Sequence, residues 1–104
     1  MLPALAHIDC WIFDLDNCLY PASANLFELI DRRMGDYIQR LCGVDVAEAR
    51  PMQKSYFHEH GTTLAGLMRT RGVDPHDFLH FVHDIDLAPI AADREVVGAI
   101  DRLP

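Results

Sequence analysis

One segment of this 104-residue chain has the pattern of a buried β-strand, and no second segment of similar quality exists. The segment from Ile8 to Phe13 is short, largely apolar, and rich in β-branched and aromatic residues, as in strands covered on both faces. A lone strand leaves its backbone donors and acceptors unpaired, which is costly when they are buried. We therefore predict that the chain is the front part of a larger α/β protein and is itself mostly helical.

The first half of the remaining sequence has the apolar spacing and end signals of two helices. Ser23 is a candidate cap for a helix along residues 26–41, and Gly43 is its expected stop. Asp45 stands three residues before a glutamate, which is the spacing of a capping box at the start of the second helix. Pro51 lies deep inside that second helix, so we expect a kink or a restart there.

The second half predicts three more helices. The signals are, in chain order, Gly61 as a stop, Thr62 or Thr63 as a cap, Gly72 as a stop, Asp74 with Pro75 as a start, and Ala92 to Leu103 as the last helix.

Charge and composition exclude several classes of protein. Nine Lys and Arg residues stand against sixteen Asp and Glu residues, and a formal charge of -7 argues against nucleic-acid and membrane-surface partners, which require a basic face. No apolar run reaches the roughly 20 residues of a membrane span, and the first residues lack the features of a signal peptide. Three cysteines form no paired framework, so we expect reduced thiols and a cytoplasmic location.

Two aspartates follow the predicted strand directly. Asp14 and Asp16 lie at its carboxyl end, which is where open parallel sheets bind ligands. Two carboxylates so close repel each other unless a cation or a shared proton relieves the repulsion, and Mg²⁺ is the natural candidate. Phosphoryl transfer would use both acids, one attacking phosphorus and the other moving protons.

The residues around these aspartates resemble a known family. The segment WIFDLDNCLYP, residues 11–21, resembles the first motif of haloacid dehalogenase-type (HAD) hydrolases, an apolar strand followed by D-x-D-x-T, and most of all that of the pyrimidine 5'-nucleotidase branch. Residues 56–68 and 81–87 also resemble the helical cap of that branch. The resemblance implies a HAD-like Rossmannoid core with an inserted cap. Residues 1–21 would hold the first core strand and catalytic loop, residues 22–88 the cap, and residues 89–104 a helix returning to the core.

The resemblance also implies a role for each aspartate. Asp14 would be the nucleophile and a Mg²⁺ ligand, whereas Asp16 would be the general acid and base and would give its backbone carbonyl to the metal. An acid at the position of Asp16 favours phosphate esters, because a halide leaving group needs no proton. Cys18 stands where the family usually has threonine. The implied substrate is a small phosphorylated metabolite, a pyrimidine nucleoside 5'-monophosphate.

Three further motifs of the family are absent from the sequence. They are a Ser or Thr after the second strand, a lysine, and a later acidic pair; the single lysine, Lys54, falls within the expected cap. Electrostatic stabilisation of the transferring phosphoryl group is usually the largest catalytic contribution. We therefore expect little or no turnover by these 104 residues alone. The alternative is a non-catalytic, cap-like helical module that binds a partner.

Other polar motifs have structural explanations that we favour. Asp84 and Asp86 form a second D-x-D, but a predicted helix precedes it, so we interpret it as part of a hinge. Histidines 76, 80 and 83 share one helical face, which suits a half-buried stripe better than a zinc site that has no fourth ligand. His58 and His60 lack the spacing of a zinc motif, although the stretch from His60 to Thr63 resembles a cap element that could face substrate.

Overall fold

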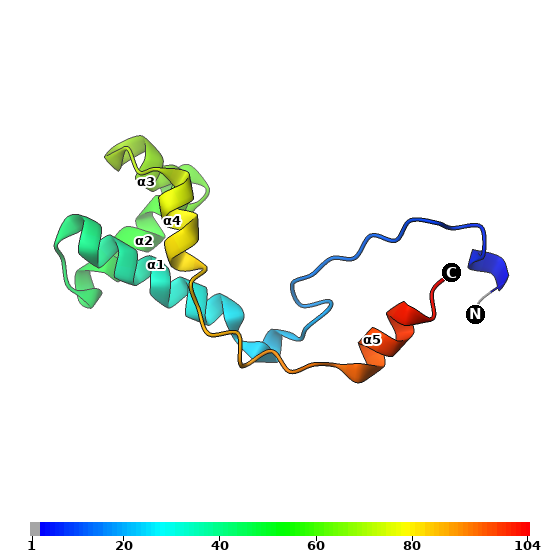
Figure 1. Ribbon diagram of the computed structural model, residues 1–104. Coiled ribbons are helices and arrows are strands. Elements are labelled where there is room, and N and C mark those ends of the chain that lie inside the picture. Colours follow the sequence, from blue (N-terminus) through cyan, green and yellow to red (C-terminus); the bar gives the residue numbers. More distant parts are fainter. Residues whose placement is uncertain (1–2) are drawn as a thin grey trace. The chain divides into compact units, whose positions relative to one another are not determined.

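The computed structural model describes residues 3–104, and every regular element among them is helical (Figure 1). The α-helices are α1 (Leu26–Cys42), α2 (Val46–His60), α3 (Thr63–Arg71), α4 (Pro75–Val82) and α5 (Arg94–Asp101), and two short 3-10 helices span Pro3–Leu5 and Ala22–Ala24.

The predicted α/β fold class is wrong for this chain. Residues 8–15 form irregular chain, drawn in blue in Figure 1, and no strand or sheet occurs within residues 3–104. A strand exists only where a neighbouring strand accepts and donates its backbone hydrogen bonds. No described residue does so here, and the side chain of Ile12 is 93% exposed. The predicted strand from Ile8 to Phe13 is therefore wrong, and the Rossmannoid core that the resemblance implies is not seen within residues 3–104.

The chain divides into two compact units. One unit, the helical unit, is Leu26–Asp86, and the other, the terminal unit, comprises the chain up to Asn25 together with Leu87–Pro104. Within the terminal unit the indole Nε1 of Trp11 donates a hydrogen bond to the carbonyl oxygen of Pro104 at 3.2 Å. The predicted roles of residues 1–21, 22–88 and 89–104 as core, cap and returning helix stay a prediction.

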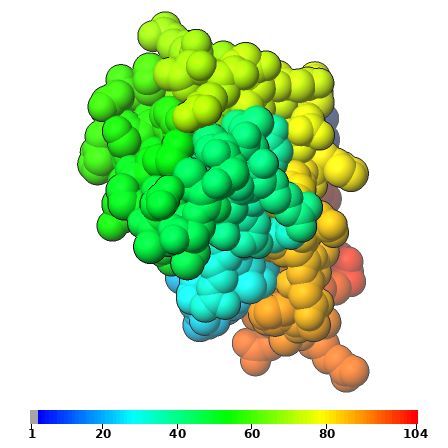
Figure 2. Space-filling view, turned by 90° about the vertical axis from the view of Figure 1, so that its left-hand side faces the viewer, coloured from blue at the N-terminus to red at the C-terminus, as the bar shows by residue number. Residues whose placement is uncertain are grey.

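The helical unit has its own apolar core. α1 packs against α2 and α4, and α2 packs against α3. Figure 2 shows the face of this unit where α1, α2 and α3 adjoin. Ile38, Leu67, Phe78 and Val82 are the largest side chains that are fully buried, and they come from three different helices. Burial of such side chains, rather than intrinsic helix propensity, supplies most of the stability of short helices.

The ends of the helices follow the local signals. Gly43 adopts a left-handed conformation (φ 66°) after α1, as expected of a glycine stop. The carboxylate of Asp45 accepts a hydrogen bond from the amide of Glu48 at 2.9 Å, and Thr62 and Asp74 cap α3 and α4 in the same manner. These predictions are confirmed.

Two details of the predicted helices are wrong, and the restart expected at Pro51 does not occur. Ser23 lies in a 3-10 helix and does not cap α1. α5 begins at Arg94 rather than at residue 92, because Asp93 accepts hydrogen bonds from two amides of the first turn and so sets its start. α2 continues through Pro51 without a restart. Pro51 and Ala47, whose carbonyl loses its helical donor, are both exposed, so water can satisfy that carbonyl.

Candidate functional site

The two predicted catalytic aspartates lie at a turn that ends the irregular segment of the terminal unit. Asp14 and Asp16 are both exposed, and residues 16–19 form the turn. The carbonyl oxygen of Leu15 accepts hydrogen bonds from the amides of Cys18 and Leu19, at 3.3 and 3.0 Å. The chain therefore reverses direction at residues 16–19. Asp16 is the first residue of this turn, and Asp14 lies two residues before it.

Asn17 stabilises this turn. Its backbone is left-handed (φ 58°), a conformation that asparagine tolerates better than most residues. Its side-chain oxygen accepts a hydrogen bond from the amide of Ala22 at 2.9 Å. Asn17 therefore has a local structural role, which the sequence analysis did not assign.

Tyr20 is the partner of Asp16. Its hydroxyl donates a short hydrogen bond to a carboxylate oxygen of Asp16. That hydrogen bond, followed by burial and the charge of Asp16, raises the pKa of the Tyr20 phenol above its usual value. The phenol holds Asp16 in one orientation, whereas no hydrogen bond or ion pair of Asp14 forms within residues 3–104.

The donor set available at this turn suits magnesium better than zinc. No group of three or more His, Cys, Asp and Glu side chains that could hold a metal ion forms within residues 3–104. Mg²⁺ is commonly bound by one or two carboxylates together with water and phosphate oxygens, whereas structural zinc needs four protein ligands. The exposed carboxylates of Asp14 and Asp16 fit the requirement for Mg²⁺. The histidines at positions 76, 80 and 83 do not form a metal site in the described chain.

The second D-x-D sequence has a different setting. Asp84 follows the end of α4, and its carboxylate lies 3.9 Å from the guanidinium of Arg33. Arg33 also donates a hydrogen bond to the carbonyl of Phe81 and lies 3.8 Å above the ring of Phe81. Asp84 therefore lies beside a cation that links α1 to α4, and the predicted hinge role of this motif stays a prediction.

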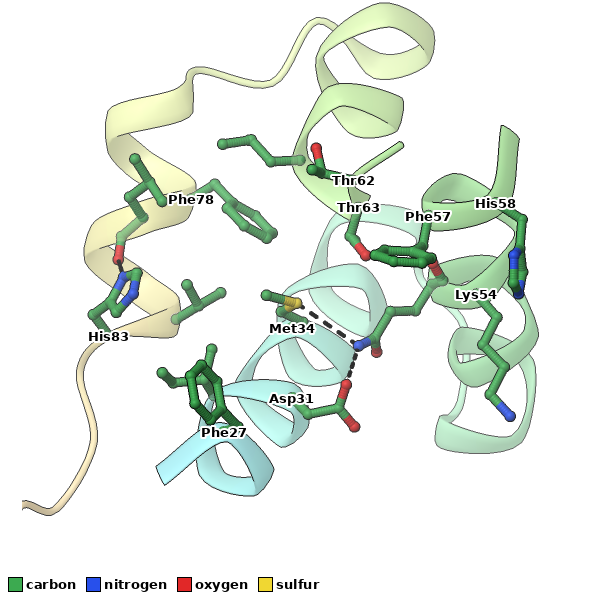
Figure 3. A pocket seen from close by; sticks show the side chains of 15 residues that line it. Phe27, Asp31, Met34, Lys54, Phe57, His58, Thr62, Thr63, Phe78 and His83 are labelled. Carbon is green, nitrogen blue, oxygen red and sulfur yellow. Dashed lines mark hydrogen bonds between the residues drawn. The ribbon is translucent and has the colours of Figure 1, made fainter. Parts of the chain in front are cut away.

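A pocket in the helical unit was missed by the sequence analysis. Its volume is about 600 Å³, and its walls are mostly apolar. Figure 3 shows Phe27 and Met34 from α1, Phe57 from α2 and Phe78 from α4 around it, with Lys54 and His58 on the side of α2. The separate residues carry no local motif, because they become neighbours only when four helices pack.

The polar groups of this pocket are mostly paired. Asp31 accepts a hydrogen bond from the side-chain amide of Gln53 at 2.6 Å and forms an ion pair with Arg50 at 3.2 Å. The hydroxyl of Thr63 donates to the carbonyl of Gln53 at 3.4 Å. Thr62 and Thr63, which the resemblance places near substrate, both line the pocket, whereas His60 does not.

Comparisons with known proteins give a similarity to a yeast protein. No protein-family model and no solved structure matches the chain. The chain is 30% identical over 76 residues to phosphate metabolism protein 8 of Saccharomyces cerevisiae (strain ATCC 204508 / S288c). The similarity covers 73% of this chain and 23% of the yeast protein. No helix within residues 3–104 is long and apolar enough to cross a bilayer.

Proposed function

We propose that this chain supplies Asp14 and Asp16 to the hydrolysis of a phosphate monoester. The observation that carries the proposal is the pair of exposed aspartates on either side of Leu15, one oriented by Tyr20 and the other accessible. The similarity to a yeast protein named for phosphate metabolism supports the same chemistry.

The two aspartates would act in two successive steps. The carboxylate of Asp14 attacks phosphorus and forms an aspartyl-phosphate, while protonated Asp16 gives its proton to the departing alkoxide. Asp16, now a carboxylate, then takes a proton from the water that attacks the phosphoenzyme. Inorganic phosphate leaves and Asp14 is regenerated. Tyr20 acts as a positioning residue, since its hydroxyl holds the carboxyl group of Asp16.

Magnesium is the metal that this proposal requires. Asp14 and the backbone carbonyl of Asp16 would hold it, and the bound ion would neutralise charge on the phosphoryl oxygens. Its affinity for the chain alone should be weak, because the two acids are exposed and no third side-chain ligand lies beside them in the described chain.

A pyrimidine nucleoside 5'-monophosphate is the substrate that we infer. This inference follows from the resemblance of residues 11–21 and 56–68 to the pyrimidine 5'-nucleotidase branch of HAD hydrolases. Steady-state turnover by the 104 residues should be slow, since the sequence lacks the further lysine and acidic-pair motifs of the family.

Chemical trapping tests the proposal without requiring fast turnover. The chain is incubated with Mg²⁺ and acetyl phosphate, any aspartyl-phosphate is reduced with borohydride, and the modified residue is located by peptide mass spectrometry. We expect modification at Asp14 that requires Mg²⁺ and is absent from Asp14→Asn. Asp16→Asn should retain the modification for longer, because the second step lacks its base.

The second Asp-x-Asp sequence provides the internal control. Asp84 and Asp86 carry the same charges and are present in the same sample, but Asp84 lies beside Arg33. Modification of Asp84 or Asp86 to the same extent as Asp14, or no modification at Asp14, would contradict the proposal.

A non-catalytic binding module is the second candidate function. It is favoured by a specific observation, namely that the helical unit has its own buried core and its own pocket, in a part of the chain that excludes Asp14. The trapping experiment separates the two candidates, because a pure binding module would show no preference for Asp14.

A further inference from the structure

The pocket of the helical unit combines apolar walls with one unbalanced charge. Phe78 is almost fully buried in its wall, whereas Phe27 and Phe57 are 61% and 55% exposed. A pocket of about 600 Å³ falls in the range of about 300–1,000 Å³ that is usual for small-molecule sites. Apolar rings left open to water at its edge would gain from being covered by a ligand.

The acid that lines the pocket is paired, whereas the lysine that lines it is not paired within residues 3–104. Asp31 is satisfied by Arg50 and Gln53. The Nδ1–H of His83 donates to the carbonyl of Leu79 at 2.7 Å, and the ring of His58 packs edge-on against Phe57. Lys54 forms no ion pair with the described residues, so its ammonium is an uncompensated cation in a chain of formal charge -7.

We propose that this pocket binds a small aromatic anion. The flat apolar body of the ligand would lie against the exposed rings of Phe27 and Phe57, and its carboxylate, sulfonate or phosphate would pair with Lys54. The charge argues for an anion over a neutral ligand, and the ring-lined walls argue for an aromatic body. This proposal holds whether or not Asp14 takes a phosphoryl group, because it depends only on residues of the helical unit.

Methionine methyl groups allow the site to be observed directly in the full chain. Met34 lines the pocket, whereas Met68 is 43% exposed on α3 and lies outside the lining. The chain is labelled with ¹³C at its methionine methyls and titrated with 2-naphthoate, and in parallel with the neutral 2-naphthamide of the same shape. We expect a saturable shift of the Met34 methyl and no shift of Met68.

The charge dependence tests the role of Lys54. Naphthoate should bind about two- to fivefold more tightly than naphthamide, as expected for an exposed ion pair. Lys54→Gln should abolish this ratio and leave naphthamide binding unchanged. Arg69→Gln is the matched control, because it removes the same charge from an exposed residue of α3 outside the lining and should preserve the ratio.

Three outcomes would overturn the proposal. The first is the absence of a saturable Met34 shift with either probe. The second is a naphthoate preference that survives Lys54→Gln. The third is a Met34 shift that follows protein concentration without any probe, because the pocket would then be covered by a second copy of the chain.

Discussion

The two units of this protein differ in what holds their residues in place. In the helical unit, four helices bury side chains contributed by one another, and each of the helices α2, α3 and α4 begins at a side-chain cap. In the terminal unit, residues 8–15 have no regular structure, and the large side chains Ile12, Phe13 and Leu15 are exposed. The terminal unit, which carries Asp14 and Asp16, therefore has fewer buried side chains to hold it in place than the helical unit.

The residues that stabilise the fold and the residues proposed for catalysis therefore lie in different units. Functional groups in proteins are most effective when the scaffold beneath them is rigid. Here Asp16 is held by Tyr20 and the turn by Asn17, but residues 12–18, which include Asp14, are all exposed. The predicted slow turnover of the chain follows from this arrangement as well as from the absence of further catalytic motifs.

The largest effect should come from truncating the core of the helical unit. Phe78 is 1% exposed, and its ring packs edge-on against Tyr37 with centroids 5.1 Å apart. Phe78→Ala should lower the free energy of unfolding by about 3–5 kcal/mol, because it leaves a cavity in the core. Urea denaturation followed by circular dichroism measures this.

Ile12→Ala is the matched control in the terminal unit. Ile12 is 93% exposed, so its truncation should change the free energy of unfolding by less than about 0.5 kcal/mol. Comparable losses for the two variants would show that the two units do not differ as described.

A smaller effect should come from the contact between α2 and α3. A Cβ added at Gly66 would lie 2.6 Å from the Cβ of Tyr56, so Gly66→Ala should destabilise the helical unit by about 1–3 kcal/mol. At Gly35 the nearest atom to an added Cβ is 3.7 Å away. Gly35→Ala should therefore be neutral or stabilising by up to about 1 kcal/mol. Equal urea midpoints for the two variants would exclude this close approach of α2 and α3.

Removal of a helix cap should have different effects in the two units. Asp74 caps α4 and Asp93 caps α5, each by accepting a hydrogen bond from an amide of the first turn. Asp74→Ala should lower the free energy of unfolding of the helical unit by about 1 kcal/mol. Asp93→Ala should leave the urea midpoint of the helical unit unchanged, and a shift as large as that of Asp74→Ala would indicate that the units unfold together.

The smallest effect should appear at alkaline pH. Burial, the hydrogen bond to Asp77 and the charge of Asp77 raise the pKa of Tyr37 from 10.0 to about 12. The folded state therefore binds this proton more tightly than the unfolded state. The stability that Tyr37 contributes is complete below pH 10 and is lost as the pH rises through 12.

Two tyrosine variants test this assignment by urea unfolding at several pH values. The stability difference between the original chain and Tyr37→Phe should be up to about 1 kcal/mol at neutral pH and should shrink between pH 10 and 12. Tyr20→Phe is the control from the terminal unit and should leave the unfolding of the helical unit unaffected at each pH. A difference for Tyr37→Phe that stays constant across this range would refute the assignment.

Most of the helices could be predicted because their signals are local. A cap such as Asp45 acts on an amide three residues away, and a stop such as Gly43 needs only its own backbone freedom. The predicted strand failed because a strand depends on a partner, which residues 3–104 do not provide.

The pocket could not be predicted for a related reason. Asp31 and Gln53 are 22 residues apart, and their pairing appears only after α1 and α2 have packed. By contrast, Asp14 and Asp16 were identifiable because they are only two residues apart in sequence, although the hydrogen bond from Tyr20 to Asp16 was not anticipated.

Hydrogen–deuterium exchange of the full chain, resolved by peptide, tests the contrast between the two units most directly. Amides of α1 to α4 should exchange slowly, because their hydrogen bonds open only when the core of the helical unit unfolds. Amides from Asp9 to Asp14 should exchange at nearly the rate of an unstructured peptide, because they have no hydrogen-bonded neighbour in the described chain. Protection of this segment comparable to that of α1 would contradict the account, since it would mean that the segment bearing Asp14 is held in a sheet.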